Sequence, residues 1–188
     1  EIQQLAKVPI LVQGDLEPGL RTKVAGETEL PPAMAITATG DTKYAYAAGK
    51  IIATEGRATG MHLALAPVVD VNNNPGNPVI NTRSFSEDPE EVALFASAFI
   101  QGLKENGMAA TAKHFPGHGD TQTDSHSFLA TIPSNHARLW SVELLPFQRV
   151  VQQGVDLVMI GHLHAPGYQP VSGVPATLSP FWIGDILR

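Results

Sequence analysis

Short apolar segments alternate with helix-like segments along this chain, and this alternation limits the possible folds more than any other feature. The apolar segments carry almost no polar residues, as expected of strands that are buried on both faces; they are residues 8–12, 62–69, 108–112 and 155–160. The helix-like segments are marked by helical spacing, capping residues and a closing glycine; they are residues 41–59, 88–106 and 134–153, with a last helix starting at Ser179-Pro180. The pattern predicts an α/β fold, either a doubly wound parallel sheet or part of a (β/α)8 barrel.

Polar side chains follow each apolar segment at the point where a strand would end. They come in pairs: Asp15 and Glu17, Asp70 and Asn72, Lys113 and His114, His162 and His164. In both candidate folds the carboxyl ends of the strands form one edge, and active sites are built there. We therefore expect the chemistry of this protein at that edge.

Composition excludes several classes of partner. The net charge is −6 and no cluster of lysine and arginine occurs, so we expect no nucleic-acid partner. No apolar run approaches the roughly 20 residues of a membrane-spanning helix, and the absence of cysteine excludes disulfides and thiolate metal sites. The compartment stays open. The chain does not begin with methionine, and we expect it to be part of a longer polypeptide.

Residues 113–126 read KHFPGHGDTQTDSH and contain a lysine, three histidines and two aspartates. Asp124 and His126 are two residues apart, so in an extended loop they share a face and the carboxylate can orient the imidazole. Such a pair is a proton shuttle near neutral pH. The alternative is that Asp124 caps a turn and His126 is only solvated. His118, between two glycines, is more typical of a structural residue.

The remaining candidate residues each have a binding and a structural interpretation. Lys113 and His114 follow a buried strand and can bind substrate hydroxyls, or Lys113 can pair with Asp15 or Asp70. Asp15 can accept hydrogen bonds from two neighbouring hydroxyls or cap the next turn. Arg83 can bind substrate, although its spacing favours an ion pair with Glu87 or Asp88.

A metal site has weaker support. His162 and His164 form an H-x-H pair of the kind that supplies two ligands in metal-dependent hydrolases, but no matching third ligand is evident. We therefore expect no metal.

Four segments together resemble glycoside hydrolase family 3, in its β-N-acetylhexosaminidase branch. Residues 113–126 resemble the branch signature KH(F/I)PGHG…DSH. GDLEPGLR (residues 14–21), LAPVVDVN (65–72) and NTRSFSEDP (81–89) resemble three further family segments in the same order. The resemblance spans about residues 8–165. It implies a TIM-type (β/α)8 barrel of which residues 1–188 are a central fragment of about four β/α units, one partial catalytic domain.

The resemblance also implies roles for individual residues. His126 backed by Asp124 would be the general acid/base, and Asp15, Arg83, Lys113 and His114 would hold the sugar. Family members retain anomeric configuration through a covalent intermediate on a carboxylate nucleophile. No segment of this chain matches the nucleophile motif, so we expect that residue elsewhere in the parent polypeptide. The resemblance implies no metal and no organic cofactor.

The expected activity is therefore exo-β-N-acetylglucosaminidase action on peptidoglycan fragments or chitooligosaccharides, with an N-acetylglucosamine-containing carbohydrate as partner. Three alternatives stay open at this point. The first is a β-glucosidase-like or phosphorylase member of the same family, the second a non-catalytic sugar-binding module, and the third a metal-dependent hydrolase that uses the histidines.

Overall fold

The computed structural model describes residues 2–133 and 135–188 of the chain. Its strands are short, and most of the regular structure is helical. The strands are β1 (Gln13–Gly14), β2 (Leu63–Ala64), β3 (Ala109–Phe115), β4 (Ala130–Thr131), β5 (Leu157–Ile160) and β6 (Leu163–His164). The α-helices are α1 (Ile2–Leu5), α2 (Ala33–Thr37), α3 (Lys43–Ala58), α4 (Pro89–Glu105), α5 (His136–Ser141) and α6 (Leu145–Gln152). Three 3₁₀ turns and a π-helical turn complete the described elements: η1 (Leu20–Thr22), η2 (Asn81–Arg83), η3 (Ala176–Leu178) and η4 (Phe181–Ile186).

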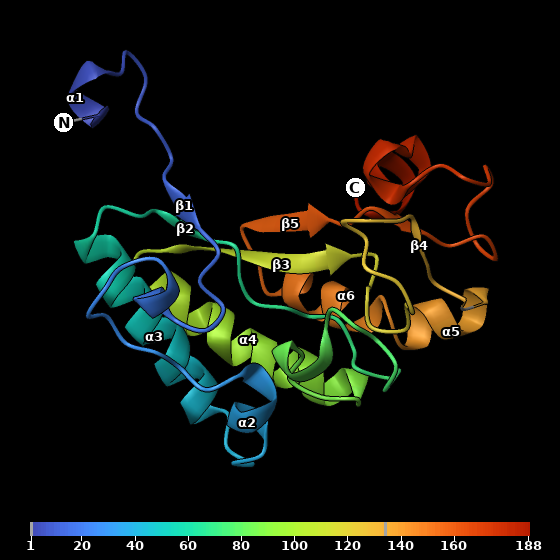
Figure 1. Cartoon of the computed structure of the whole chain (residues 1–188), viewed down its shortest axis with the longest axis horizontal. Helices are drawn as coiled ribbons and strands as arrows, with labels where there is room; N and C mark the ends of the chain where they lie inside the picture. The colour runs from blue at the N-terminus through green and yellow to red at the C-terminus, as the bar shows by residue number, and fades with distance from the viewer. Residues whose placement is uncertain (1, 134) are drawn as a thin grey trace.

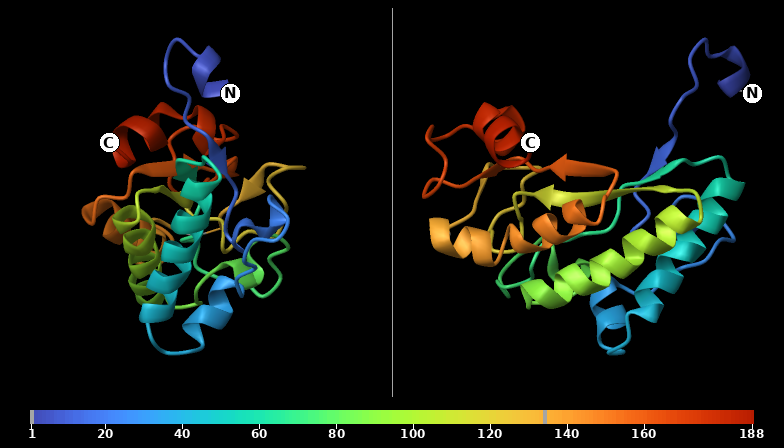
Figure 2. Two further views of the ribbon diagram at one scale, coloured as in Figure 1. Left: turned by 90° about the vertical axis from the view of Figure 1, so that its left-hand side faces the viewer. Right: turned by 180° about the vertical axis from the view of Figure 1, so that it is seen from behind.

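The main sheet is parallel and has the order β1-β2-β3-β5. Each strand therefore lies beside the next sheet strand in the sequence, without the reversal of order that defines a doubly wound sheet. Helices α3, α4 and α6 all lie on the same side of the sheet, as Figures 1 and 2 show. Sequential order with helices on one face is the arrangement of a (β/α)8 barrel segment.

Two of the predicted helices form within a few residues of their predicted bounds. Asp88 caps α4 by accepting hydrogen bonds from the backbone N–H groups of Glu90 and Glu91, both at 2.9 Å. Gly107 follows α4 with a φ of 80°, a conformation that glycine adopts without strain. The predicted helix over residues 41–59 is confirmed as α3.

The predicted strands are displaced or shortened. Residues 8–12 form no strand, because pairing with the sheet starts only at the Val12 carbonyl, which accepts from the His62 and Leu63 N–H groups. Of the predicted strand 62–69, only Leu63 and Ala64 form regular strand pairs; the Ala66 and Pro67 carbonyls still accept from the Thr111 and Lys113 N–H groups, although Pro67 has no N–H to donate in return. Beyond it, Val68 makes a single parallel bridge to Lys113.

Two further predictions of element boundaries are wrong. The helix predicted over residues 134–153 is two helices, α5 and α6, because Pro146 suits a first helical turn and cannot continue a preceding helix. Ser134, its predicted start, lies outside the described residues. The strand predicted to end at Ala112 runs on to Phe115, so Lys113 and His114 belong to β3 instead of the loop after it.

The hydrophobic core lies between the sheet and its helices. Its large buried side chains include Ile52, Phe85, Phe99, Leu103 and Phe147. Among residues 2–133 and 135–188, no helix has both the length and the apolar character needed to cross a bilayer.

Candidate active site

Three predicted site residues meet at the carboxyl edge of the sheet around one carboxylate, Glu17. Lys113 extends from β3 and its side chain is only 2% exposed. Its ammonium contacts Asp15 Oδ1 at 2.7 Å and also pairs with Glu17. On its other side Glu17 accepts two hydrogen bonds from Arg83, from Nε at 2.8 Å and from Nη2 at 2.7 Å. The structure thus joins Asp15, Lys113 and Arg83 through Glu17.

The interpretation of Arg83 as a partner of Glu87 or Asp88 is wrong. Its guanidinium spans to the segment after β1 because a planar fork matches the two oxygens of the Glu17 carboxylate. Burial alone would raise the pKa of Glu17, but hydrogen bonding from Arg83 and the charges of Lys113 and Arg83 outweigh it and lower that pKa. The hydrogen bond to Glu17 raises the pKa of Arg83. Both groups are therefore held in their charged forms.

Asp70 is fully buried and fixes the second half of the site. It accepts hydrogen bonds from the backbone N–H of His114 at 3.1 Å and of His118 at 2.6 Å, and its Oδ2 lies 2.7 Å from His114 Nδ1. Burial would raise the pKa of Asp70, and the charge and hydrogen bond of His114 reverse this and lower it. Because an ionised carboxylate only accepts, His114 carries its proton on Nδ1 and keeps Nε2 for another partner.

The pairing register shifts between Lys113 and Phe115 in β3, and such irregularities change the direction in which side chains point. Lys113 turns to the Asp15 and Glu17 carboxylates while His114 turns to Asp70. Lys113 therefore pairs with Asp15, one of its two predicted partners. The other predicted partner, Asp70, pairs with His114.

The Asp124–His126 pair forms on the loop after β3. His126 Nδ1 lies 2.7 Å from Asp124 Oδ1, and the backbone N–H of His126 donates to the same oxygen at 2.9 Å. These two hydrogen bonds lower the pKa of Asp124. The His126 side chain is 83% exposed and that of Asp124 46%. The dyad thus exists as predicted, but it stands in solvent and makes no described contact with Asp15, Arg83 or Lys113.

Sequence reasoning assigned no role to Glu17 and considered Asp70 only as a possible partner of Lys113, although each connects several site residues. The signal was present, since both are carboxylates that follow a strand at the active edge. A carboxylate that binds other site residues looks the same in a sequence as one that binds substrate.

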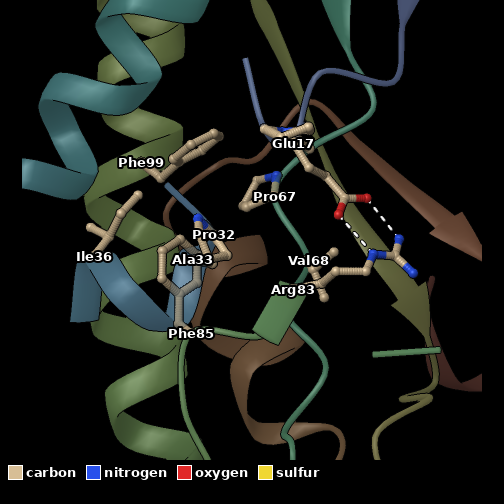
Figure 3. Close-up of a pocket in the computed structure, with 11 residues that line it drawn as sticks. Glu17, Pro32, Ala33, Ile36, Pro67, Val68, Arg83, Phe85 and Phe99 are labelled. Atoms are coloured by element: carbon tan, nitrogen blue, oxygen red, sulfur yellow. Dashed lines mark hydrogen bonds and ion pairs between the residues drawn. The ribbon is translucent and has the colours of Figure 1, made fainter. Parts of the chain in front are cut away.

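A mostly apolar pocket of about 240 Å³ lies directly behind the Glu17–Arg83 pair. In Figure 3 the ion pair stands at one side, and Ile36, Phe85 and Phe99 line the opposite wall. Glu17 and Arg83 are the only charged residues among those that line it. A sugar ring carries hydroxyls that need hydrogen-bonding partners, so the polar edge around Asp15 and Lys113 is the better candidate for a carbohydrate site.

The two histidines of the H-x-H pair turn to different partners. The Nδ1 atom of His162 bonds to the Thr177 hydroxyl at 2.8 Å, and His164 Nε2 accepts from the Gly173 N–H at 2.9 Å. Within the described part of the chain, no three histidine, aspartate or glutamate side chains are grouped to hold a metal ion.

Comparison with known families decides between the two folds considered so far. The family described as "Glycosyl hydrolase family 3 N terminal domain" matches this chain over residues 1–188. The chain belongs to glycoside hydrolase family 3. The resemblance seen in the sequence is confirmed, and the sheet with its outer helices is part of the TIM-type barrel of this family.

Relatives in the family carry hexosaminidase names. A β-hexosaminidase from Stenotrophomonas maltophilia (strain R551-3) is 41% identical over 194 residues, which cover 100% of this chain and 56% of the relative. A family 3 β-N-acetylglucosaminidase structure from Paenibacillus sp. str. FPU-7 superposes with a TM-score of 0.92 at 45% identity, over 97% of this chain and 35% of that one. NagZ from Neisseria gonorrhoeae, in complex with N-trifluoroacetyl-D-glucosamine, gives 0.89 at 34% identity, over 100% of this chain and 56% of that one. The chain thus spans about half the length of the curated relative.

Proposed function

We propose that the full-length protein containing this chain is a retaining exo-β-N-acetylglucosaminidase that acts on peptidoglycan fragments or chitooligosaccharides. Family membership and the names of the relatives support a hexosaminidase. The observation that carries the proposal is the Asp124–His126 hydrogen bond of 2.7 Å on the loop after β3. A carboxylate-oriented imidazole is a proton donor and acceptor, and its loop follows directly from the strand that carries Lys113 and His114.

The edge of the sheet supplies the sugar-binding groups in this proposal. Asp15 is half exposed and accepts hydrogen bonds from two neighbouring hydroxyls, Lys113 donates to another, and Nε2 of His114 accepts from a further one. Nη1 of Arg83 already donates to the Val79 carbonyl at 3.1 Å, so Arg83 binds the sugar through the guanidinium N–H groups that neither Val79 nor Glu17 occupies. Because Glu17 and Asp70 already fix three of these side chains, the edge loses little side-chain entropy when the sugar binds.

The dyad performs the proton transfers. Protonated His126 donates the proton on Nε2 to the glycosidic oxygen as the bond to the anomeric carbon breaks, and a carboxylate in another part of the parent polypeptide forms the glycosyl-enzyme bond. Neutral His126 then takes a proton from the attacking water as that bond is hydrolysed. Asp124 accepts from Nδ1 throughout and so keeps Nε2 directed to the reaction. The exposed loop closes over the bound sugar to bring His126 into reach.

Replacement of His126 in the full-length protein tests the proposal. His126→Ala should lower turnover of an aryl β-N-acetylglucosaminide with a poor leaving group by about 10²–10⁴-fold, the usual contribution of general acid–base catalysis. His62→Ala is the matched control, because His62 precedes β2 at the opposite end of the sheet. Unchanged turnover in His126→Ala would contradict the assignment of the acid/base.

The assay also separates the remaining alternatives. A neutral histidine base repels an anionic acceptor less than a carboxylate does, so the reaction is run with and without inorganic phosphate. Sugar phosphate as the main product would identify a phosphorylase. Binding of N-acetylglucosamine without turnover by the full-length protein would identify a sugar-binding module.

A further inference from the structure

His118 is a buried histidine that the proposed reaction does not use. Its side chain is 1% exposed, yet both ring nitrogens have partners. Nδ1 lies 2.6 Å from the Thr121 hydroxyl, and Nε2 lies 2.9 Å from the hydroxyl of Ser125. Ser125 is the residue between Asp124 and His126, so the buried ring contacts the middle of the acid/base pair.

The backbone around His118 is fixed by the fold. Its N–H donates to Asp70 Oδ1 at 2.6 Å, and its carbonyl accepts from the Asn77 side chain at 2.8 Å. The following residue, Gly119, packs so closely on Val71 that an added Cβ would lie 1.7 Å from the Val71 carbonyl oxygen. His118 therefore cannot move without disrupting the buried segment that carries Asp70.

Asp70 connects this segment to the sugar-binding edge. The same carboxylate accepts from His118 through Oδ1 and from the His114 ring through Oδ2. A continuous series of hydrogen bonds thus runs from His114 through Asp70 and His118 to Ser125. It links a residue proposed to hold the sugar to the loop that carries the proposed acid/base.

We propose that His118 is a positioning residue for the acid/base loop and acts through the Ser125 hydroxyl. The inference rests on the proposed function, because it assigns the loop its catalytic role. Ser125 is the described side-chain contact between the exposed dyad and a buried group, so it is the fixed point about which the loop closes over the sugar. Without it, the closing loop would sample more positions, and His126 would reach the glycosidic oxygen less often. Proton transfer requires hydrogen-bond geometry, so loss of this anchor reduces acid catalysis.

The environment of His118 suits this role. Burial lowers the pKa of His118, although the charge of Asp70 opposes the shift, so burial favours the neutral ring. A neutral ring can hold the Ser125 hydroxyl with either nitrogen protonated, since a hydroxyl both donates and accepts. It holds the loop without placing a second positive charge beside the acid.

The test replaces Ser125 in the full-length protein. Ser125→Ala removes the contact and leaves Asp124 and His126 in place. We expect kcat/KM to fall about 10–100-fold for a chitooligosaccharide, whose leaving group needs a proton. For 2,4-dinitrophenyl β-N-acetylglucosaminide, kcat/KM should stay within twofold, because that leaving group departs without protonation. Ser125→Thr keeps the hydroxyl and should retain activity, and Ser127→Ala, an exposed serine of the same loop, is the matched control.

A second variant examines the other partner of the contact. His118→Gln keeps a side-chain donor and should lose less activity than His118→Leu, in the same leaving-group-dependent way. Thermal unfolding of each variant shows whether a loss reflects the loop or the fold.

Three results would overturn the inference. The first is that Ser125→Ala keeps its kcat/KM for chitooligosaccharide while His126→Ala loses activity on the same substrate. This result would overturn the role of His118 and leave the proposed function intact. The second is an equal loss on both substrates, which indicates general disruption. The third is an unaffected His126→Ala, which removes the proposed acid/base itself and with it the role of His118.

Discussion

At the scale of single residues, Glu17 shows how a carboxylate can organise a site without reacting. It is mostly buried between two cations that come from distant parts of the chain, Arg83 and Lys113. Its negative charge keeps Arg83 and Lys113 close together despite their mutual repulsion. Removing that charge leaves Lys113 buried with Asp15 as its one remaining ion-pair partner among the described residues.

Glu17→Gln in the full-length protein should therefore lower the free energy of unfolding by about 1–3 kcal/mol, the range for a hydrogen bond to a charged group. The folded pKa of Glu17 lies below its ordinary value of 4.5, so this stabilisation is present above about pH 4.5 and is lost as the pH falls below it. Urea unfolding at pH 7 and pH 3.5 measures both effects. Glu29→Gln, which removes an exposed ion pair with Arg21, serves as control. A loss at pH 3.5 as large as that at pH 7 would contradict the explanation.

The Asp124–His126 contact could be predicted from the sequence because it is local. Asp124 and His126 are two positions apart, so a short loop brings them together whatever the rest of the fold does. The partners of Arg83 and His114 could not be predicted in this way, because Glu17 is 66 residues from Arg83 and Asp70 is 44 residues from His114. Such pairings depend on strand order and register, which the sequence pattern leaves open.

At the scale of elements, two glycines let helices α3 and α4 approach closely. A Cβ on Gly49 of α3 would lie 2.2 Å from the Phe99 carbonyl oxygen, and one on Gly102 of α4 would lie 2.1 Å from the Tyr46 carbonyl oxygen. Glycine weakens a helix by about 1 kcal/mol relative to alanine, and here the close packing of two backbones offsets that cost.

Gly49→Ala should consequently destabilise the protein by about 1–3 kcal/mol, as overpacking does, even though alanine is the better helix former. Differential scanning calorimetry of the full-length protein measures the change. In Gly184→Ala the added Cβ meets nothing within 4 Å, so this variant should keep its melting temperature. Equal melting temperatures for the Gly49 variant and the unmodified protein would show that the helices can move apart without cost.

Helices were easier to predict than strands because a helix depends mainly on its own residues. A helix is specified by its own capping residues, as Asp88 shows for α4. A strand exists only where a neighbour pairs with it, and the apolar residues 8–12 have no strand beside them. The two prolines within predicted elements, Pro67 and Pro146, lack an N–H and were visible in the sequence.

At the scale of the whole molecule, the four-stranded sheet has two open edges. β1 and β5 are the outer strands, and residues 2–12 extend away from the sheet in Figures 1 and 2. The apolar side chains of Val8 and Leu11 are 74% and 75% exposed. Exposed sheet edges with apolar side chains promote pairing between molecules.

The 188-residue chain expressed alone should therefore self-associate. Light scattering after size exclusion should give a mass well above 20.0 kDa that rises with concentration. Val8→Lys together with Leu11→Lys places charges next to the β1 edge and should reduce the association. Val24→Lys with Ala25→Lys adds equal charge away from the sheet edge and is the control. A monomer at all concentrations would show that these edges are protected.

The shared carboxylate of Asp70 has a consequence for how this enzyme family can diversify. Under the roles proposed above, a change at that position alters the proposed sugar-binding edge and the proposed acid/base loop together, so neither can change alone through it. Asp15 stands outside this coupling, since its contact is with Lys113. Under the same proposed roles, a change at Asp15 would alter the contacts with the sugar without affecting the loop, whereas a change in the segment from His114 to Ser125 would affect both.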